Sequence, residues 1–281
     1  MASDEALLAI GEVSDRTGVN TVTLRAWQRR YGLLKPQRTP KGHRLYSEQD
    51  VQRIKEILSW LDKGVAVSQV KQLLGQGDVV DAASVQNLPE VAALKDAVMR
   101  FDARAVKSRL AELTKNYPIS TLEMTVINPL SDWFRSQNTD VMKVCDSFWH
   151  TTLAHELVHR LHNNSKVPSK KQCWLVAMQG DQPHRAYLQA LLLQSEGYNV
   201  TIIEGLDSGL GILHKALTDQ HVEKLVIYSD SSFSASVKRE VENLLSKTEL
   251  NTDLLGQCRL IHPELVNSAT PSVNANLERQ Q

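Results

Sequence analysis

Two short helical segments near the N-terminus constrain the fold of this 281-residue chain more than any other feature. The first segment ends at Thr17-Gly18, a typical helix stop, and Asn20 is a good N-cap for a second helix from Thr21 to Arg30. Two helices separated by so short a turn are typical of helix-turn-helix proteins, in which the second helix enters a DNA major groove. The sequence therefore predicts a helix-turn-helix at residues 10–30.

The spacing of apolar residues predicts which face of the second helix is exposed. Val22 and Ala26 are expected to face inward, with Trp27 a candidate for the same face. Four polar side chains can then face outward: Thr23, Arg25, Gln28 and Arg29.

A second structural signal follows the helix pair. Pro36, Pro40 and Gly42 stand between apolar anchors and predict a tight β-hairpin, a wing, with basic residues at its tip. Ser47 and Asp50 then form a Ser-x-x-acid capping box that begins a further helix. Together these segments predict a winged helix-turn-helix.

Charge is distributed unevenly along the chain, although Lys and Arg together equal Asp and Glu, at 32 each. Residues 1–75 hold 12 basic and 8 acidic residues, a net of +4, so the remaining residues, with 20 and 24, carry −4. From Arg16 to Arg44 there are eight basic residues and no carboxylate. A block of one sign in an otherwise neutral chain favours a polyanionic partner.

The same region resembles the DNA-binding domain of the MerR family of transcriptional regulators over about 70 residues. The matching motifs are Ile10-Gly11-Glu12-Val13, Gly18-Val19, Thr23-Leu24-Arg25-Ala26-Trp27, Tyr31-Gly32-Leu33, Pro36-Gln37-Arg38-Thr39 and Gly42-His43-Arg44-Leu45-Tyr46. The version with Trp27 resembles the MlrA-like subgroup, whose C-terminal half is related to cobalamin-binding domains. The resemblance implies a sequence-specific DNA-binding transcriptional regulator, with its recognition helix in the major groove and its basic wing on the adjacent backbone.

Side-chain chemistry and the resemblance together select the candidate DNA contacts. Arg25 resembles a family phosphate contact, and Gln28 is long enough to reach a base edge. The resemblance to the MerR family implies that His43, Arg44 and Tyr46 belong to the wing, and Arg38 lies near them in the sequence. The candidate set is Thr23, Arg25, Gln28, Arg38, His43, Arg44 and Tyr46. Leu24 and Leu45 are interpreted as core, and Trp27 is left open between core and contact.

Composition and periodicity divide the chain into several parts, giving a multi-domain α and α/β fold. The DNA-binding domain is expected at 8–76, and a small polar linker at 77–89. Helical spacing over 90–168 predicts a four-helix bundle. Alternating strands and helices over 171–266 predict a small doubly wound parallel α/β effector domain, flavodoxin-like and similar to cobalamin domains, with a fourth strand at Leu260 and Ile261. A mobile tail is expected at 267–281.

The predicted bundle contains a metallopeptidase-like motif, His155-Glu156-Leu157-Val158-His159. Histidines at i and i+4 on a helix share a face and can both ligate zinc, with Glu as general base. No downstream His or Glu at the usual spacings offers a third ligand. A zinc-dependent hydrolase and a structural metal on His155 and His159 are the alternatives. The favoured interpretation is a packed or solvated helix face, with no metal and no enzyme activity.

Cobalamin-binding relatives place a cobalt-ligating histidine in an Asp-x-His-x-x-Gly loop after the first strand. Here two residues separate Asp181 from His184, Gln182 takes the ligand's place counting back from Gly197, and Tyr187 replaces the glycine. His184 is therefore interpreted as a helix-terminal surface residue, and the departures argue against a cobalamin cofactor. A cobalamin- or small-molecule-sensing regulator is the alternative.

Composition also bears on location and partners. No apolar run approaches a membrane span, the acidic N-terminus is unlike a signal peptide, and three distant cysteines argue against disulfides. We expect a cytoplasmic protein with no membrane partner. The expected partners are double-stranded promoter DNA, a second copy on that DNA, and a protein signalling partner. No sustained heptad pattern predicts a dimerisation helix directly after the linker.

Overall fold

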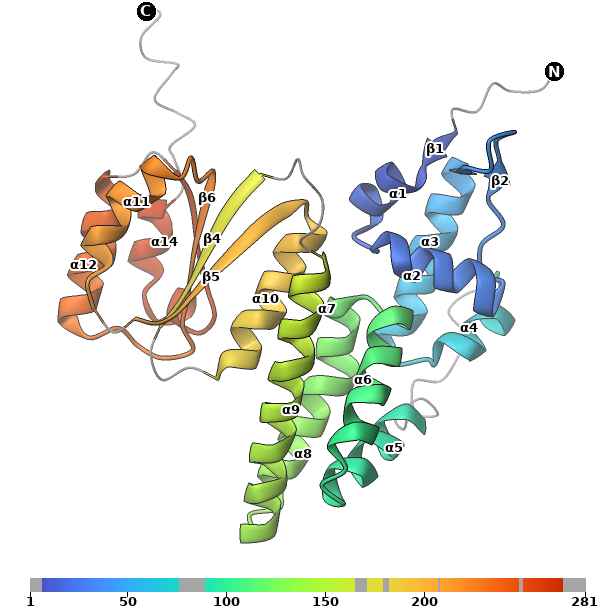
Figure 1. Cartoon of the computed structure of the whole chain (residues 1–281), viewed down its shortest axis with the longest axis horizontal. Helices are drawn as coiled ribbons and strands as arrows, with labels where there is room; N and C mark the ends of the chain where they lie inside the picture. The colour runs from blue at the N-terminus through green and yellow to red at the C-terminus, as the bar shows by residue number, and fades with distance from the viewer. Residues whose placement is uncertain are drawn as a thin grey trace, which may run out of the picture. The chain divides into compact units, whose positions relative to one another are not determined.

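The computed structural model describes residues 7–75, 89–164, 171–178, 182–206, 208–247 and 250–269. The chain divides into two compact units, Met1–His159 and Arg160–Gln281 (Figure 1). All but the last residue of the predicted linker, at 77–89, lies outside the described residues.

The first unit begins with short strands and helices whose ends follow the predicted signals. In chain order they are β1 (Leu8–Ala9), α1 (Ile10–Thr17), α2 (Thr21–Ala26), the π-helical segment η1 (Trp27–Tyr31), β2 (Gln37–Arg38), β3 (Arg44–Tyr46), α3 (Glu48–Asp62) and α4 (Val67–Leu73). Gly18 ends α1 at φ +70°, where a glycine is favoured. The Asn20 side chain accepts a hydrogen bond from Thr23 N at 2.9 Å, and Ser47 and Asp50 form the predicted capping box of α3.

Five further helices complete the first unit. They are α5 (Pro89–Met99), α6 (Ala103–Asn116), α7 (Ile119–Leu122), which continues through the π-helical η3 (Glu123–Ile127) into α8 (Asn128–Ser136), and α9 (Asp140–Asn164), whose last residues belong to the second unit. Asp102 caps α6, because its side chain accepts a hydrogen bond from Ala105 N at 2.9 Å. Fully buried apolar side chains from these helices form their core: Leu94, Ala97, Val98, Val106, Val126 and Trp149.

The second unit is a four-stranded parallel sheet of order β5-β4-β6-β7. Its elements are β4 (Lys171–Met178), α10 (Pro183–Ser195), β5 (Tyr198–Leu206), η4 (Leu210–Ile212), α11 (Leu213–Asp219), β6 (Lys224–Tyr228), α12 (Ala235–Lys247), β7 (Asn251–Leu255), α13 (Cys258–Ile261) and α14 (Pro263–Ala269). Helix α10 lies on one face of the sheet, and α11 and α12 lie on the other (Figure 1).

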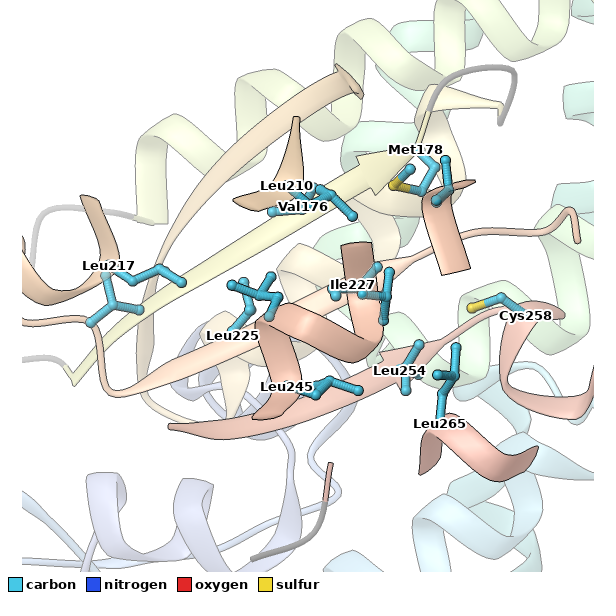
Figure 2. Packing of buried hydrophobic residues seen from close by; sticks show 14 residues of the cluster. Val176, Met178, Leu210, Leu217, Leu225, Ile227, Leu245, Leu254, Cys258 and Leu265 are labelled. Atoms are coloured by element: carbon cyan, nitrogen blue, oxygen red, sulfur yellow. The ribbon is translucent and has the colours of Figure 1, made fainter. Parts of the chain in front are cut away.

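Alternating apolar residues of the strands form the core of the second unit. Val176 of β4, Ile227 of β6 and Leu254 of β7 pack against Leu245 of α12 and Leu265 of α14 (Figure 2). A parallel sheet that is covered by helices on both faces needs strands with apolar residues on both sides. Strand β6 meets this requirement, because Leu225 to Tyr228 are all buried. The predicted parallel α/β domain is therefore present.

Two sequence expectations for the end of the chain are wrong. Leu260 and Ile261 do not form the fourth strand but lie in α13, largely exposed, because strand β7, which begins nine residues before Leu260, occupies the sheet edge. Helix α14 continues to Ala269, so the first three residues of the predicted tail, 267–269, are helical. Residues 270–281 lie outside the described part of the chain. None of the helices in the described ranges is both long enough and apolar enough to span a membrane.

Candidate nucleic-acid interface

One face of the second helix is exposed and basic. Val22, Arg25 and Arg29 are all exposed, and their i, i+3, i+7 spacing places them on the same side of α2 and η1. Val22, at 48% exposed, is an apolar side chain beside two guanidinium groups. This arrangement presents positive charge and one apolar contact along a single helix face.

The structure corrects the predicted orientation of this helix. Thr23 is 0% exposed, although the sequence analysis placed it outside, and Val22 is exposed, although it was placed inside. The cause is Trp27, which is fully buried. Because Thr23 lies four residues before Trp27, the two share the buried face, and Val22 turns outward with Arg25.

Strands β2 and β3 form an antiparallel hairpin that carries the other predicted contacts. Arg38 lies opposite Arg44 in the register, and β3 pairs on its other side with β1. Thr39 N donates to His43 O at 2.9 Å, Gly42 occupies the tight turn at φ +83°, and His43 is exposed. The basic side chains therefore lie on a short, internally bonded hairpin.

A hydrogen bond joins the helix to the hairpin. Arg44 Nε donates to Gln28 Oε1 at 2.6 Å, and Gln28 is half-buried. The bond fixes the guanidinium of Arg44 beside η1 while Arg25 projects from the neighbouring turn. Two side chains that the sequence predicted as separate contacts thus form one unit.

Tyr46 lies beneath the basic side chains. Its ring is fully buried, and its hydroxyl oxygen has no hydrogen-bond partner among the described residues. Burial raises the pKa of Tyr46, while the positive charges of Arg44, Arg25 and Arg38 oppose that increase. The charges of Arg44, Arg25 and Arg38, three of the predicted basic contacts, therefore act on this buried phenol, and Asp50 opposes them.

The buried side of the recognition helix is attached to helix α6. Trp27 Nε1 donates to the backbone carbonyl of Asn116 at 2.7 Å, and both residues are buried. Arg30 lies 3.8 Å from Glu112 in an exposed ion pair, which contributes little by itself. The orientation of η1 is thus set by a residue 89 positions away in sequence.

Two more polar contacts hold the same junction on its α3–α4 side. Val67 N donates to the Tyr117 hydroxyl at 3.1 Å, and burial strongly raises the pKa of that phenol. Thr121 Oγ1 donates to Asp62 Oδ1 at 2.9 Å. Residues 7–75 therefore pack against α6 and α7 through specific buried bonds within the first unit.

The metallopeptidase-like motif lies on α9. His155 and His159 are both exposed, and Glu156 is half-buried. In the described parts of the chain no group of three His, Cys, Asp or Glu side chains is placed to hold a metal ion. The geometry gives the zinc-hydrolase alternative no support.

His184, the candidate cobalt ligand, lies in the first turn of α10 as its sequence position predicts, but it is 3% exposed. Its interpretation as a surface residue is therefore wrong. His184 shares a helix face with Leu188 and Leu191, four and seven residues later, and both of these are buried as well. A buried imidazole does not fit the role of a cobalt ligand for a cofactor at the sheet edge.

The strand ends near His184 are closely packed. Arg185 pairs with Asp230 at 3.3 Å, and Tyr228 Oη donates to Asp230 at 2.7 Å. A Cβ at Gly256 would lie 2.4 Å from Ser229 O, so β7 leaves the sheet directly against the loop after β6. The contacts of Arg185, Asp230 and Gly256 thus give no support to a cobalamin ligated through His184.

Comparison with known proteins assigns the family. A model of the MerR HTH family regulatory protein matches residues 8–76. The mercuric resistance operon regulatory protein of Bacillus cereus is 32% identical over 112 residues, covering 39% of this chain and 84% of that protein. The chain belongs to the MerR family.

Similarity to one group of MerR proteins extends beyond the helix-turn-helix. The HTH-type transcriptional regulator MlrA of Escherichia coli K12 is 44% identical over 127 residues, a longer stretch than 8–76, which confirms the MlrA-like resemblance. This match covers 44% of the chain and 51% of MlrA, so the chain spans about half the length of that relative. A cobalamin-binding protein from Desulfitobacterium hafniense DCB-2 superimposes with a TM-score of 0.35 at 10% identity, over 62% of this chain and 88% of that one.

Proposed function

We propose that this MerR-family chain is a sequence-specific DNA-binding transcriptional regulator. The observation that carries the proposal is the exposed face of Val22, Arg25 and Arg29, joined to the basic hairpin by the Gln28–Arg44 hydrogen bond. Helix α2 with η1 enters the major groove, and the β2–β3 hairpin acts as the wing on the adjacent backbone.

Each side chain has a distinct role in this proposal. Arg25, Arg38 and Arg44 neutralise phosphates, and the exposed imidazole of His43 extends that contact at the hairpin tip. Gln28 holds Arg44 and lies close to the base edges. Val22 supplies the apolar contact that suits the methyl group of thymine. Thr23 is not part of the interface, because it is buried.

Tyr46 supports the same contact from below. Its buried hydroxyl has no hydrogen-bond partner among the described residues, and the positive charges of Arg44, Arg25 and Arg38 act on it. A phosphate oxygen drawn between Arg25 and Arg44 would supply that acceptor once the side chains adjust. We therefore assign Tyr46 a phosphate contact made only in the complex.

The remainder of the chain is proposed to control this interface. Helices α5–α9 form the predicted bundle, and the α/β domain over 171–266 is the effector half, which binds a protein signalling partner in the cytoplasm. Two copies read a pseudo-palindromic promoter site, one per half-site. No cofactor is needed for the DNA contact, since all its groups belong to residues 22–46.

The test is DNA binding by the full chain to duplexes selected from a random library. We expect preferential binding to selected over scrambled duplex. Arg25→Ala should weaken binding to both sequences, and Val22→Ala should reduce only the preference, by about 1 kcal/mol. Lys107→Ala, which removes an exposed positive charge on α6, is the matched control and should change neither.

Equal affinity for selected and scrambled duplex would contradict sequence-specific recognition. An Arg25→Ala effect no larger than that of Lys107→Ala would contradict the assignment of the interface to α2.

A further inference from the structure

Helix α9 has one face that is buried in the first unit and a second, partly apolar face that the described residues of that unit leave largely exposed. Cys145, Trp149, Leu153 and Leu157 recur every four residues and are buried in the first unit. Trp149 Nε1 also donates to Ser131 Oγ at 2.9 Å, which fixes that face against α8. The rotation of α9 about its axis is therefore determined.

The opposite face carries a second regular pattern. Its positions are Val141, Val144, Phe148, Thr151 and His155, at spacings of three and four residues. Val141 is 63% and Val144 57% exposed, Phe148 is half-buried, and Thr151 and His155 are exposed. We call these five residues the α9 seam. Alternating spacings of three and four are the pattern by which helices pair side by side.

Phe101 widens this apolar surface. It adopts φ +55°, a left-handed conformation that is unfavourable for a bulky side chain, and it is 46% exposed. Its ring meets that of Phe148 edge-on, with centroids 5.4 Å apart. Phe101, Val144, Phe148 and Thr151 line a shallow hollow of about 480 Å³ together with Lys143 and Ser147.

We propose that the α9 seam is the surface through which two copies of this chain associate. Its charge suits a second copy, because Asp140 and Lys143 beside the seam form a 3.1 Å ion pair and cancel each other. Two identical seams related by a two-fold axis therefore meet without repulsion and can exchange these ion pairs. A strongly acidic or basic partner gains nothing from such a surface.

The alternative position for a dimerisation helix is occupied. Helix α5 comes directly after residues 76–88, but Leu94, Ala97 and Val98 are fully buried within the first unit. Its apolar face is therefore unavailable to another chain. The biological role of this dimer rests on the proposed function, in which two copies bind DNA together. Whether two copies associate through the α9 seam does not depend on DNA binding.

The test is sedimentation equilibrium of the full chain without DNA. We expect a dimer whose dissociation constant increases at least about tenfold in Val144→Glu, because the carboxylate would be buried against its two-fold mate. Met124→Glu is the matched control, since Met124 is also an exposed apolar residue of the first unit and lies outside the seam. It should leave the dissociation constant unchanged.

A second variant reports contact directly. All three native cysteines are buried, so Thr151→Cys introduces an accessible thiol at the middle of the seam. We expect mild oxidation to give a covalent dimer, whereas Ser108→Cys on α6 should remain monomeric under the same conditions. Circular dichroism shows whether Val144→Glu is folded. If it is not, Thr151→Cys still tests the contact between two seams.

Three results would overturn the proposal: a parent chain that is monomeric at about 100 µM, well above a micromolar dissociation constant; an unchanged dissociation constant in folded Val144→Glu; or equal cross-linking of the two cysteine variants. Each of these can occur while the parent still binds DNA selectively. Conversely, a chain that dimerises through the seam but does not distinguish selected from scrambled duplex contradicts the proposed function alone.

Discussion

Two buried hydroxyl groups lie beneath the basic surface, those of Thr23 and Tyr46, and neither has a hydrogen-bond partner among the described residues. An unpaired buried hydroxyl costs a folded protein about 1–3 kcal/mol. The free protein would therefore be more stable with an apolar side chain at each position. The two sites differ in their electrostatics, because the positive charges of Arg44, Arg25 and Arg38 act on Tyr46.

This difference predicts opposite outcomes for two similar substitutions. Thr23→Val and Tyr46→Phe should each increase the free energy of unfolding by about 1 kcal/mol, since each removes an unpaired buried oxygen. Thr23→Val should leave DNA affinity unchanged, whereas Tyr46→Phe should weaken it severalfold by removing the phosphate contact. Urea unfolding and fluorescence anisotropy measure the two effects.

Each variant serves as the control for the other. A Tyr46→Phe protein with the affinity of the parent would show that the hydroxyl has no role in the complex. Weaker DNA binding by Thr23→Val would show that the buried face of α2 matters more than its exposed side.

At the scale of elements, the proposed recognition helix is attached to α6 by a buried hydrogen bond from Trp27 Nε1 to the Asn116 carbonyl. The bond joins two segments that are far apart in sequence, so the orientation of η1 depends on the helices that follow the DNA-binding residues. A substitution in α6 can therefore change the orientation of η1, and with it the proposed DNA contact, without altering any contact residue.

Trp27→Phe tests this attachment, because it retains most of the ring packing but removes the donor. We expect a loss of about 1–3 kcal/mol in unfolding free energy, because the Asn116 carbonyl is left buried and unpaired. DNA affinity should fall as η1 loses its fixed orientation. Trp60→Phe, at another buried tryptophan of the same unit, should leave DNA affinity unchanged.

If Trp27→Phe is destabilised but binds DNA with the affinity of the parent, the attachment is structural only. If it is neither destabilised nor impaired, the hydrogen bond contributes nothing measurable.

The ends of helices could be predicted from sequence because their signals are local. Asn20 and Ser47 cap α2 and α3 as their side chains indicate. The exposed face of α2 could not be predicted, because a six-residue helix offers too few apolar positions to define a face. The deciding contact, between Trp27 and Asn116, spans 89 residues.

Two other differences have the same origin in tertiary packing. His184 lies in the first turn of a helix, as predicted, yet it is buried with Leu188 and Leu191 of the same face. The α9 seam could not be predicted from sequence, because apolar residues lie on two sides of the helix and the structure alone shows which side the first unit buries.

On the scale of the whole molecule, the chain has no net charge, but its excess of positive charge lies near the N-terminus. Residues 1–75 carry +4, and most of that excess lies on α2, η1 and the β2–β3 hairpin. The second unit instead contains a closely packed parallel sheet, and His184 beside it is buried. Affinity for a polyanion should therefore depend on the N-terminal residues alone, and control of it on the rest of the chain.

The salt dependence of DNA binding tests this account most directly. Each phosphate contact changes the slope of log affinity against log salt concentration by about 0.9. Arg44→Ala should weaken binding to all duplexes and flatten that slope by about one, whereas Lys107→Ala should leave it unchanged. An Arg44→Ala slope identical to that of the parent would contradict the assignment of the hairpin and α2 as the DNA-binding surface.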